Sequence, residues 1–263
     1  MDRETVAGHP TITVGDGSRT LVVLPGLGDA LGPTETPLVV RLVLRRYYRP
    51  FTDRYTVHVV SRPRGLGGKT TTREMATGYA KVLAEVGPAD VLGVSMGGLI
   101  AQHLGAEHSG CVDRLVIAVA AHRLGEEGRR IVERWRELGR GNHWKELYRD
   151  TIRVTYEDPR RRAVYGALGR LPPVVPRPEE PEDFLVSVTA CLDHDAGDVL
   201  SEIDVPTLVI GGDEDPLFPA DLIAESAHVI PDATLKLLPG TGHGAFEERK
   251  RGFDASVRRF LAE

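Results

Sequence analysis

The sequence feature that most constrains the fold is Gly93-Val94-Ser95-Met96-Gly97-Gly98, a Gly-x-Ser-x-Gly motif between an apolar run and a helical pattern. The run ADVL precedes the motif and the pattern LIAQHLGAEH follows it. A tight turn from a strand into a helix strains the backbone of the serine, and glycines are needed around it because a Cβ would collide with the neighbouring elements. Such a turn exposes the serine Oγ at the carboxyl edge of a sheet. Ser95 is therefore predicted to be a nucleophile.

Seven short runs of apolar and β-branched residues predict strands. They cover residues 11–14, 20–26, 55–62, 90–95, 114–120, 206–212 and 234–240. Helical patterns separate most of these runs, and the clearest of them opens on a capping box of Thr71 and Glu74 and ends at Gly87. Strands that alternate with helices predict an α/β fold with a mostly parallel β-sheet that helices cover on both faces.

The alternation stops between about residues 122 and 198. This segment holds two amphipathic stretches, residues 126–139 and 144–156, and then a proline-rich piece, residues 171–184, with no convincing strand. Its arginines alternate with Glu and Asp, which is typical of a solvated helix face rather than of an anion-binding patch. We therefore predict a core of residues 1–121 and 199–263, into which residues 122–198 are inserted as a helical cap between stiff loops.

Charge and composition argue against several classes of protein. The chain has 33 Lys and Arg against 38 Asp and Glu, a formal net charge of −5, so it has no bias toward nucleic acid or an anionic membrane. No stretch approaches the roughly 20 apolar residues of a membrane-spanning helix. The first residues, MDRETVAGHP, lack the basic start and apolar run of a secretory signal. We expect a cytoplasmic protein.

The two cysteines, Cys111 and Cys191, lie far apart in the sequence, and neither has a second Cys or a His at a metal-ligand spacing. This pattern predicts two reduced thiols rather than a disulfide framework or a zinc site. The sequence also lacks a Gly-rich phosphate-binding loop. Neither a cofactor nor a metal is expected, and the sequence makes no prediction of the oligomeric state.

A serine hydroxyl needs a neighbouring base to take its proton, and histidine has a suitable unperturbed pKa, about 6.5. His243 has the best setting, because residues 238–244 form a glycine-lined loop between the last strand run and the last helical pattern. His122 and His194 stand near the ends of the insertion and could reach a site, although a structural role is the commoner one. Six others have structural or surface settings: His9, His58, His103, His108, His143 and His228.

The base must in turn be held in one tautomer by an acid on a loop after another strand. Three acids, Asp213, Glu214 and Asp215, follow the run PTLVI. Asp215 directly precedes Pro216, which fixes the turn, and is the predicted acid; Asp213 is the alternative and is expected to brace the loop. The order Ser, acid, His along the chain is the one expected on an α/β sheet that is covered on both faces.

An oxyanion formed at Ser95 needs hydrogen-bond donors. The backbone N–H of Met96 is one candidate, since it opens the helix after Ser95 and lies at the positive end of the helix dipole. The other is expected on a loop after an earlier strand. Residues 25–29, Pro-Gly-Leu-Gly-Asp, have the glycines that let an N–H turn inward, which makes the N–H of Leu27 the second candidate.

Together these motifs resemble the α/β-hydrolase superfamily over residues 10–121 and 199–263, and in particular its capped, esterase-like branch of serine hydrolases. The resemblance implies that the turn at Ser95 is a nucleophile elbow, and that Asp215 and His243 complete a catalytic triad. It also implies that the N–H groups of Met96 and Leu27 form the oxyanion hole.

The sequence departs from the family pattern at two places. The usual His-Gly pair before the oxyanion loop is Pro25-Gly26, and the usual Asp-x-x-Gly segment is altered within residues 61–67. The second change brings in Arg62 and Arg64. We expect these arginines to form salt bridges on the surface, the alternative being contact with an anionic group of a substrate.

The resemblance implies a carboxylesterase that cleaves short- to medium-chain carboxylic esters of small molecules through an acyl-enzyme. Alternatives on the same triad are a lactonase, a thioesterase, a carbon–carbon bond hydrolase and a perhydrolase. A dehalogenase or epoxide hydrolase is disfavoured, because those members need a carboxylate where Ser95 stands. A ligand-binding receptor without turnover is the alternative outside enzymes. Apolar residues of the insertion are candidates for the substrate pocket: Trp135, Trp144, Leu171, Val174, Val175 and Phe184.

Overall fold

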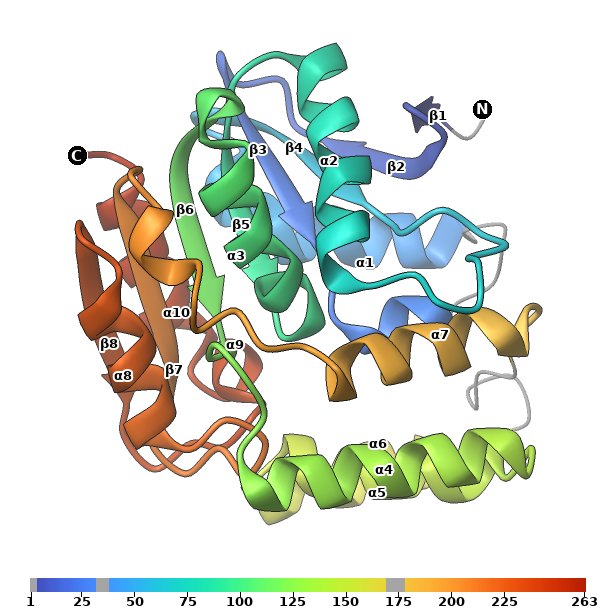
Figure 1. Cartoon of the computed structure of the whole chain (residues 1–263). Helices are drawn as coiled ribbons and strands as arrows, with labels where there is room; N and C mark the ends of the chain where they lie inside the picture. Colours follow the sequence, from blue (N-terminus) through green and yellow to red (C-terminus); the bar gives the residue numbers. More distant parts are fainter. Residues whose placement is uncertain (1–3, 32–37, 169–177) are drawn as a thin grey trace.

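The structure is a computed structural model that describes residues 4–31, 38–168 and 178–263. Eight strands form one sheet (Figure 1): β1 Glu4–Val6, β2 His9–Val14, β3 Arg19–Leu24, β4 Tyr55–Val60, β5 Ala89–Val94, β6 Val112–Ala118, β7 Thr207–Gly212 and β8 Ala233–Leu238. Their order is β1-β2-β4-β3-β5-β6-β7-β8. The pairs that involve β1 or β2 are antiparallel and the remaining pairs are parallel. The predicted α/β fold with a mostly parallel sheet is confirmed, and each predicted run overlaps a strand.

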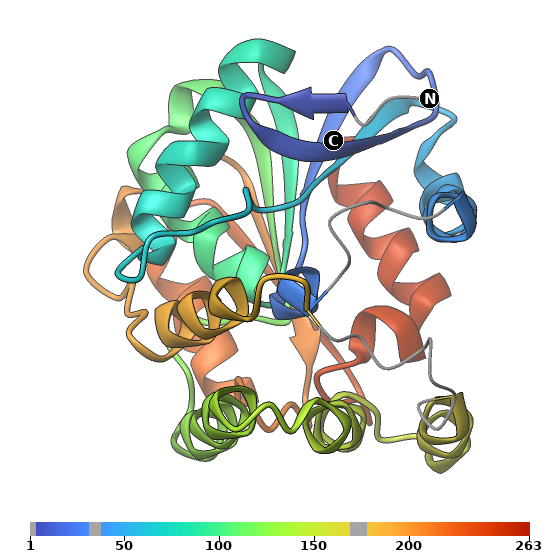
Figure 2. The same cartoon turned by 90° about the vertical axis from the view of Figure 1, so that its right-hand side faces the viewer.

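Helices cover both faces of the sheet. The described α-helices are α1 Leu38–Tyr48, α2 Thr72–Val86, α3 Met96–Glu107, α4 Glu126–Arg140, α5 Trp144–Thr155, α6 Pro159–Leu168, α7 Pro181–Leu192, α8 Ala220–Val229, α9 Ala245–Glu248 and α10 Lys250–Phe260. Short 3₁₀ turns are η1 Leu27–Leu31, η2 Arg49–Phe51, η3 Ser109–Cys111 and η4 Leu200–Glu202. Seen from the side in Figure 2, α2 and α3 lie on one face of the sheet and α1 and α10 on the other. None of the described helices has both the length and the apolar character of a membrane span.

Side-chain alternation along the strands builds one apolar layer on each face. In β3, Val22 and Leu24 join the layer under α2 and α3, whereas Leu21 and Val23 join the layer under α1 and α10. All four side chains are fully buried. Burial on both faces explains why this strand reads as an unbroken apolar run rather than as an alternating one.

The capping box at the start of α2 forms as the sequence predicts. The Thr71 hydroxyl accepts a hydrogen bond from the Glu74 N–H at 3.2 Å, and the Glu74 carboxylate accepts one from the Thr71 N–H at 2.8 Å. The Thr71 backbone and side-chain donors lower the pKa of Glu74. The cap therefore fixes where α2 begins, directly after the loop of residues 61–70.

Four helices, α4 to α7, follow β6 and precede β7 in the chain. In space they lie across the carboxyl ends of the strands (Figure 1). The two amphipathic stretches that the sequence indicates correspond to α4 and α5. The proline-rich piece falls partly outside the described residues, and its end opens α7 with Pro181 in the first turn. An isolated β-bridge between Arg123 and Asp195 joins the two ends of this segment. The division of the chain into a core and a cap remains a prediction.

A buried histidine ties this segment to the core. His194, just after α7, hydrogen-bonds through Nδ1 to the Thr72 hydroxyl at 2.8 Å and through Nε2 to the Gln102 side-chain oxygen at 3.3 Å. Its ring also stands edge-on to that of His103, 5.3 Å away. Burial, together with the neighbouring His103 and His122, lowers the pKa of His194 to about 3. His194 therefore has a structural role and stays neutral in the folded protein.

Acid should destabilise the fold through His194. Its folded pKa of about 3 lies below the value of about 6.5 for an unfolded histidine, so below pH 6.5 the unfolded chain binds a proton that the folded chain excludes. The stabilisation is complete above about pH 6.5 and is lost as the pH falls from there toward about 3. Between about pH 7.5 and about pH 5 we expect a loss near 2 kcal/mol from this group. Urea unfolding at both pH values measures it, and His194→Gln should show a smaller pH dependence. Equal pH dependence in both proteins would contradict the assignment.

Candidate active site

Ser95 lies at the turn between β5 and α3, in a strained backbone conformation with φ 55° and ψ −119°. This positive φ is unfavourable for a residue with a Cβ. The turn is possible only because the residues on either side lack a Cβ. A Cβ on Gly97 would lie 2.0 Å from the Leu24 carbonyl oxygen, and one on Gly93 would lie 2.3 Å from the Gly97 carbonyl oxygen. The Ser95 N–H donates to the Ala118 carbonyl at 2.9 Å. The serine is thus held at the carboxyl edge of the sheet.

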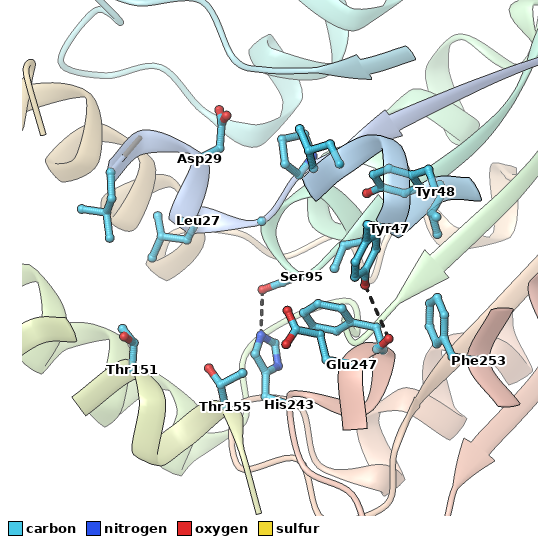
Figure 3. A pocket seen from close by; sticks show the side chains of 18 of the residues that line it. Leu27, Asp29, Tyr47, Tyr48, Ser95, Thr151, Thr155, His243, Glu247 and Phe253 are labelled. Carbon is cyan, nitrogen blue, oxygen red and sulfur yellow. Dashed lines mark hydrogen bonds between the residues drawn. The ribbon is translucent and has the colours of Figure 1, made fainter. Parts of the chain in front are cut away.

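Ser95, His243 and Asp215 form one chain of hydrogen bonds. His243 comes from the loop between β8 and α9, and its Nε2 lies 2.9 Å from the Ser95 Oγ (Figure 3). Its Nδ1 lies 2.8 Å from Oδ2 of Asp215. With the proton of the imidazole on Nδ1, the ring donates to the carboxylate and Nε2 is free to accept the serine proton. The arrangement can therefore generate a serine nucleophile and stabilise the imidazolium that results.

Backbone donors hold Asp215 in place. Its second oxygen, Oδ1, accepts hydrogen bonds from the N–H groups of Leu217 at 2.8 Å and Phe218 at 3.2 Å, and the residue is buried. Both carboxylate oxygens are therefore occupied, and Oδ2 is the one aimed at His243. Asp213, the alternative acid, is exposed and instead accepts from the Gly240 N–H at 2.8 Å. Asp213 lies outside the chain of hydrogen bonds that leads to Ser95.

The predicted oxyanion donors belong to the first residues of α3 and η1. Met96 is the first residue of α3, and the N–H groups of a first helical turn have no acceptor within their own helix. Leu27 begins η1, directly after Gly26. The loop at Gly26 approaches Ser95 so closely that a Cβ there would lie 3.3 Å from the serine Cβ. The structure thus brings both candidate donor residues next to the nucleophile.

Arg62 is buried, so the expectation of a surface salt bridge is wrong. Only 1% of its side chain is exposed. Its Nη1 donates to the Pro25 carbonyl and its Nη2 to the Gly26 carbonyl, both at 3.0 Å, and Nη2 lies 3.6 Å from the Asp29 carboxylate. The backbone N–H of Arg62 also donates to Asp29 at 3.0 Å. Arginine is rarely buried alone, and here the carbonyls and the carboxylate of the 25–29 loop compensate the charge and the two Nη groups, whereas the buried Nε has no hydrogen-bond partner among the described residues.

Arg64 approaches the same loop from outside. It is half-buried, and its Nη2 donates to the Asp29 carbonyl at 3.2 Å. Both arginines of the altered family segment therefore contact the loop that carries Leu27. Sequence reasoning missed this role, because the acceptors lie about 35 residues earlier in the chain.

A cavity of about 490 Å³ opens beside Ser95 and His243, and most of its lining is apolar. Trp135 and Phe184, two of the predicted pocket residues, line it. Trp144 does not; it is buried behind the wall, with its ring edge-on to that of Phe184 at 5.7 Å. The other three predicted pocket residues lie outside the described part of the chain: Leu171, Val174 and Val175.

Much of the lining comes from residues that sequence reasoning did not select. Thr151 and Thr155 belong to α5, and further residues come from α1, α9 and α10. The apolar pattern of an amphipathic helix predicts which residues face the protein interior. It does not distinguish a residue that is packed in the core from one that borders a cavity. Among the described residues, no cluster of His, Cys, Asp and Glu is placed to hold a metal ion.

The model of the alpha/beta hydrolase family matches residues 21–255. The chain belongs to this family. The predicted superfamily is thereby confirmed, and the α/β-hydrolase fold with it.

Two curated relatives of this α/β hydrolase are pimeloyl-[acyl-carrier protein] methyl ester esterases. That of Neisseria meningitidis is 26% identical over 184 residues, which cover 66% of this chain and 69% of the relative. That of Vibrio cholerae is 26% identical over 233 residues, which cover 80% and 85%. Among solved structures, the enol-lactonase from Burkholderia xenovorans has a TM-score of 0.80 at 21% identity, with 98% of each chain covered. That likeness shows the fold.

Proposed function

We propose that this α/β hydrolase is a carboxylesterase that cleaves short- to medium-chain carboxylic esters through an acyl-enzyme on Ser95. The observation that carries the proposal is the hydrogen-bonded chain from Ser95 through His243 to Asp215 at the wall of an apolar cavity. A nucleophile, its base and the group that orients the base are the parts that acyl transfer needs.

In the first step, the Ser95 Oγ bonds to the ester carbonyl carbon while its proton passes to Nε2 of His243. The carbonyl π electrons move to oxygen, and the N–H groups of Met96 and Leu27 donate to the oxyanion. Asp215 keeps its negative charge and stabilises the imidazolium. When the tetrahedral intermediate collapses, the alcohol oxygen takes the proton from His243 and leaves.

In the second step, water replaces the alcohol. His243 takes a proton from the water as its oxygen bonds to the acyl carbon, and the same N–H groups hold the second oxyanion. The intermediate releases Ser95, which regains its proton from His243, and the carboxylic acid departs. The cycle uses one ester and one water and requires no group that the chain does not supply.

The relatives support an ester as the substrate class. The names of the Neisseria and Vibrio proteins give a methyl ester as the bond that they cleave. At 26% identity these names indicate the chemistry rather than the rest of the substrate. A methyl ester also fits a site whose cavity is mostly apolar.

We further propose that α4 to α7 act as a cap over the site. Trp135 of α4 and Phe184 of α7 border the cavity. In addition, the Thr155 carbonyl at the end of α5 accepts a hydrogen bond from the Gly244 N–H at 2.6 Å, directly after His243. This bond supports a link between the cap and the loop that carries the base.

Steady-state hydrolysis of p-nitrophenyl esters from acetate to decanoate tests the proposal. We expect turnover of the short and medium esters, and stoichiometric inactivation by diisopropyl fluorophosphate with the adduct on the Ser95 peptide. A lactone and a thioester of equal length are assayed beside the esters. Faster turnover of either one would replace the carboxylesterase assignment, and binding without release of product would favour a receptor.

A further inference from the structure

We divide the lining of the cavity beside Ser95 into two arms, one on each side of the Ser95–His243 pair in Figure 3. The cap arm is lined by Leu27, Leu31, Trp135, Thr151, Thr155 and Phe184. The second arm, which we name the α1 arm, is lined by Val43, Leu44, Tyr47, Leu92, Val94 and Phe253. In Figure 3, Leu27, Thr151 and Thr155 lie on one side of the Ser95–His243 pair, and Tyr47, Tyr48 and Phe253 lie on the other. A substrate bound at Ser95 can therefore extend in two directions.

Strand β5 fixes the course of the α1 arm. Leu92 and Val94 belong to the apolar layer on the α1 and α10 face of the sheet, whereas Val91 belongs to the opposite layer. Val94 directly precedes Ser95, and Leu92 lies three residues before it. At a strand rise of about 3.3 Å per residue, the arm therefore runs about 10 Å back along β5 from the nucleophile.

Helix α1 forms the outer wall of this arm. Leu44 and Tyr47 are half-buried and line the cavity, and Leu92 lines it from the sheet, so the arm separates α1 from β5. Val43 also lines the arm but is 58% exposed, which places it where the arm meets solvent. Leu42, on the same helix, is 57% exposed and lies outside the lining. Neighbouring positions of one helix thus differ in whether they border the arm.

We propose that the α1 arm binds an unbranched, methyl-terminated hydrocarbon chain of the substrate. This inference takes its substrate class from the proposed function. The walls are aliphatic and aromatic, so transfer of each methylene from water into the arm should tighten binding by about fourfold. A depth of about 10 Å suits a medium-length chain rather than an acetyl group. The arm therefore sets the chain-length preference.

The polar groups at this side of the cavity select against a charged end on that chain. Glu247 and Asp254 both line the cavity. Glu247 accepts hydrogen bonds from the Tyr156 hydroxyl at 2.6 Å and the Tyr165 hydroxyl at 3.4 Å, and Asp254 is paired with Lys250 at 2.6 Å. The nearby cations are already paired: Lys250, which lies over the Tyr47 ring, binds both oxygens of Asp254, and Arg161 lies 3.9 Å from Glu247. A chain that ends in a third carboxylate would therefore lose its hydration among apolar walls without gaining an unpaired cation. A methyl terminus carries no such penalty.

Binding to Ser95→Ala tests the proposal without dependence on turnover. Isothermal titration calorimetry compares methyl octanoate with methyl butanoate, and we expect the longer ester to bind about two orders of magnitude more tightly. Adding Leu44→Trp should fill the arm and lower octanoate affinity by about tenfold, while butanoate affinity changes by less than about twofold. The matched control is Leu42→Trp, which adds the same indole outside the arm and should leave both affinities unchanged.

Two further measurements keep the test decisive. Leu44→Ala enlarges the arm and should shift the preference to longer chains, so the proposal does not depend on whether Leu44→Trp folds. Monomethyl suberate, which matches methyl octanoate in length but ends in a carboxylate, should bind more weakly than methyl octanoate. The proposal is overturned if both Leu44 variants keep the octanoate-to-butanoate ratio, if Leu42→Trp changes it as much as Leu44→Trp does, or if suberate binds equally well.

The outcome separates this inference from the proposed function. If Ser95→Ala binds octanoate in a Leu44-dependent way while the wild type hydrolyses no ester, the chain-binding arm stands and the esterase assignment fails. If the wild type hydrolyses esters with a length preference that Leu44 does not influence, the esterase assignment stands and the arm fails.

Discussion

Asp215→Asn should lower kcat for ester hydrolysis by about four orders of magnitude, the loss that a wrong histidine tautomer causes in a serine triad. The surroundings of Asp215 fix which atom of the new amide faces the base. Its Oδ1 accepts from the N–H groups of Leu217 and Phe218, so the amide oxygen should keep these bonds and the NH₂ group should point to His243. An NH₂ group donates to Nδ1 and places the imidazole proton on Nε2, where the ring cannot accept the proton of Ser95. Steady-state assays on a p-nitrophenyl ester measure the loss of kcat.

Asp213→Asn is the matched control for this prediction. Asp213 is exposed and accepts one hydrogen bond, from the Gly240 N–H, which an amide oxygen can also accept. A surface change of this kind alters stability by less than about 0.5 kcal/mol, and we expect kcat to stay within about twofold of the wild type. A large loss in Asp213→Asn together with a small one in Asp215→Asn would transfer the role of the acid to Asp213.

Local sequence was sufficient to predict seven of the eight strands and the start of α2. Each predicted run overlaps a strand because a buried strand of a parallel sheet needs apolar, β-branched residues on both faces, as β3 shows. Strand β1, Glu4–Val6, was not predicted, since three residues with one acid carry too little pattern for a prediction. The start of α2 was predicted because the capping box is a local interaction between Thr71 and Glu74.

The nucleophile was predictable because the turn at Ser95 requires glycines that form a short sequence motif. Gly93 and Gly97 are required because a Cβ at either position would lie less than 2.5 Å from a backbone oxygen, and the Gly-x-Ser-x-Gly motif makes this requirement visible in the sequence. The loops with His243 and Asp215 could be selected because parallel strands bring their carboxyl ends to one edge of the sheet. The sequence indicated which three residues meet, but the geometry of the hydrogen bonds between them depends on the tertiary structure.

Long-range partners explain what the sequence did not predict. The burial of Arg62 depends on carbonyl groups from the 25–29 loop, which a pattern of charges around residue 62 does not reveal. That Leu44 lines the cavity depends on where α1 lies relative to β5, which the sequence of this helix does not reveal. The sequence could not show that Trp135 lines the cavity while Trp144 packs behind it, because this difference depends on the contact of Trp144 with Phe184.

Arg62→Met should lower kcat by about two orders of magnitude while it leaves KM within about threefold, because a shift of about 1 Å in a catalytic group can cost this much in rate. The guanidinium holds the Pro25 and Gly26 carbonyls at 3.0 Å and lies 3.6 Å from Asp29. These contacts fix the loop that presents the Leu27 N–H. Methionine keeps much of the buried volume but donates no hydrogen bond, so the loop loses its restraint. We therefore predict a positioning role for Arg62, since it does not itself contact the reacting atoms.

A displaced oxyanion donor and partial unfolding would both lower the rate, but only the displaced donor would also weaken the binding of an oxyanion analogue in the folded protein. A trifluoromethyl ketone, which forms an oxyanion on Ser95, should bind to Arg62→Met more weakly in proportion to the fall in kcat/KM, because both depend on the same N–H donor. Arg62→Lys keeps the positive charge but lacks the planar fork that reaches two carbonyls. It should therefore recover more of the thermal stability than of kcat. If instead the melting temperature falls while kcat and ketone affinity stay at the wild-type level, Arg62 supports folding alone and the Leu27 loop needs no restraint for catalysis.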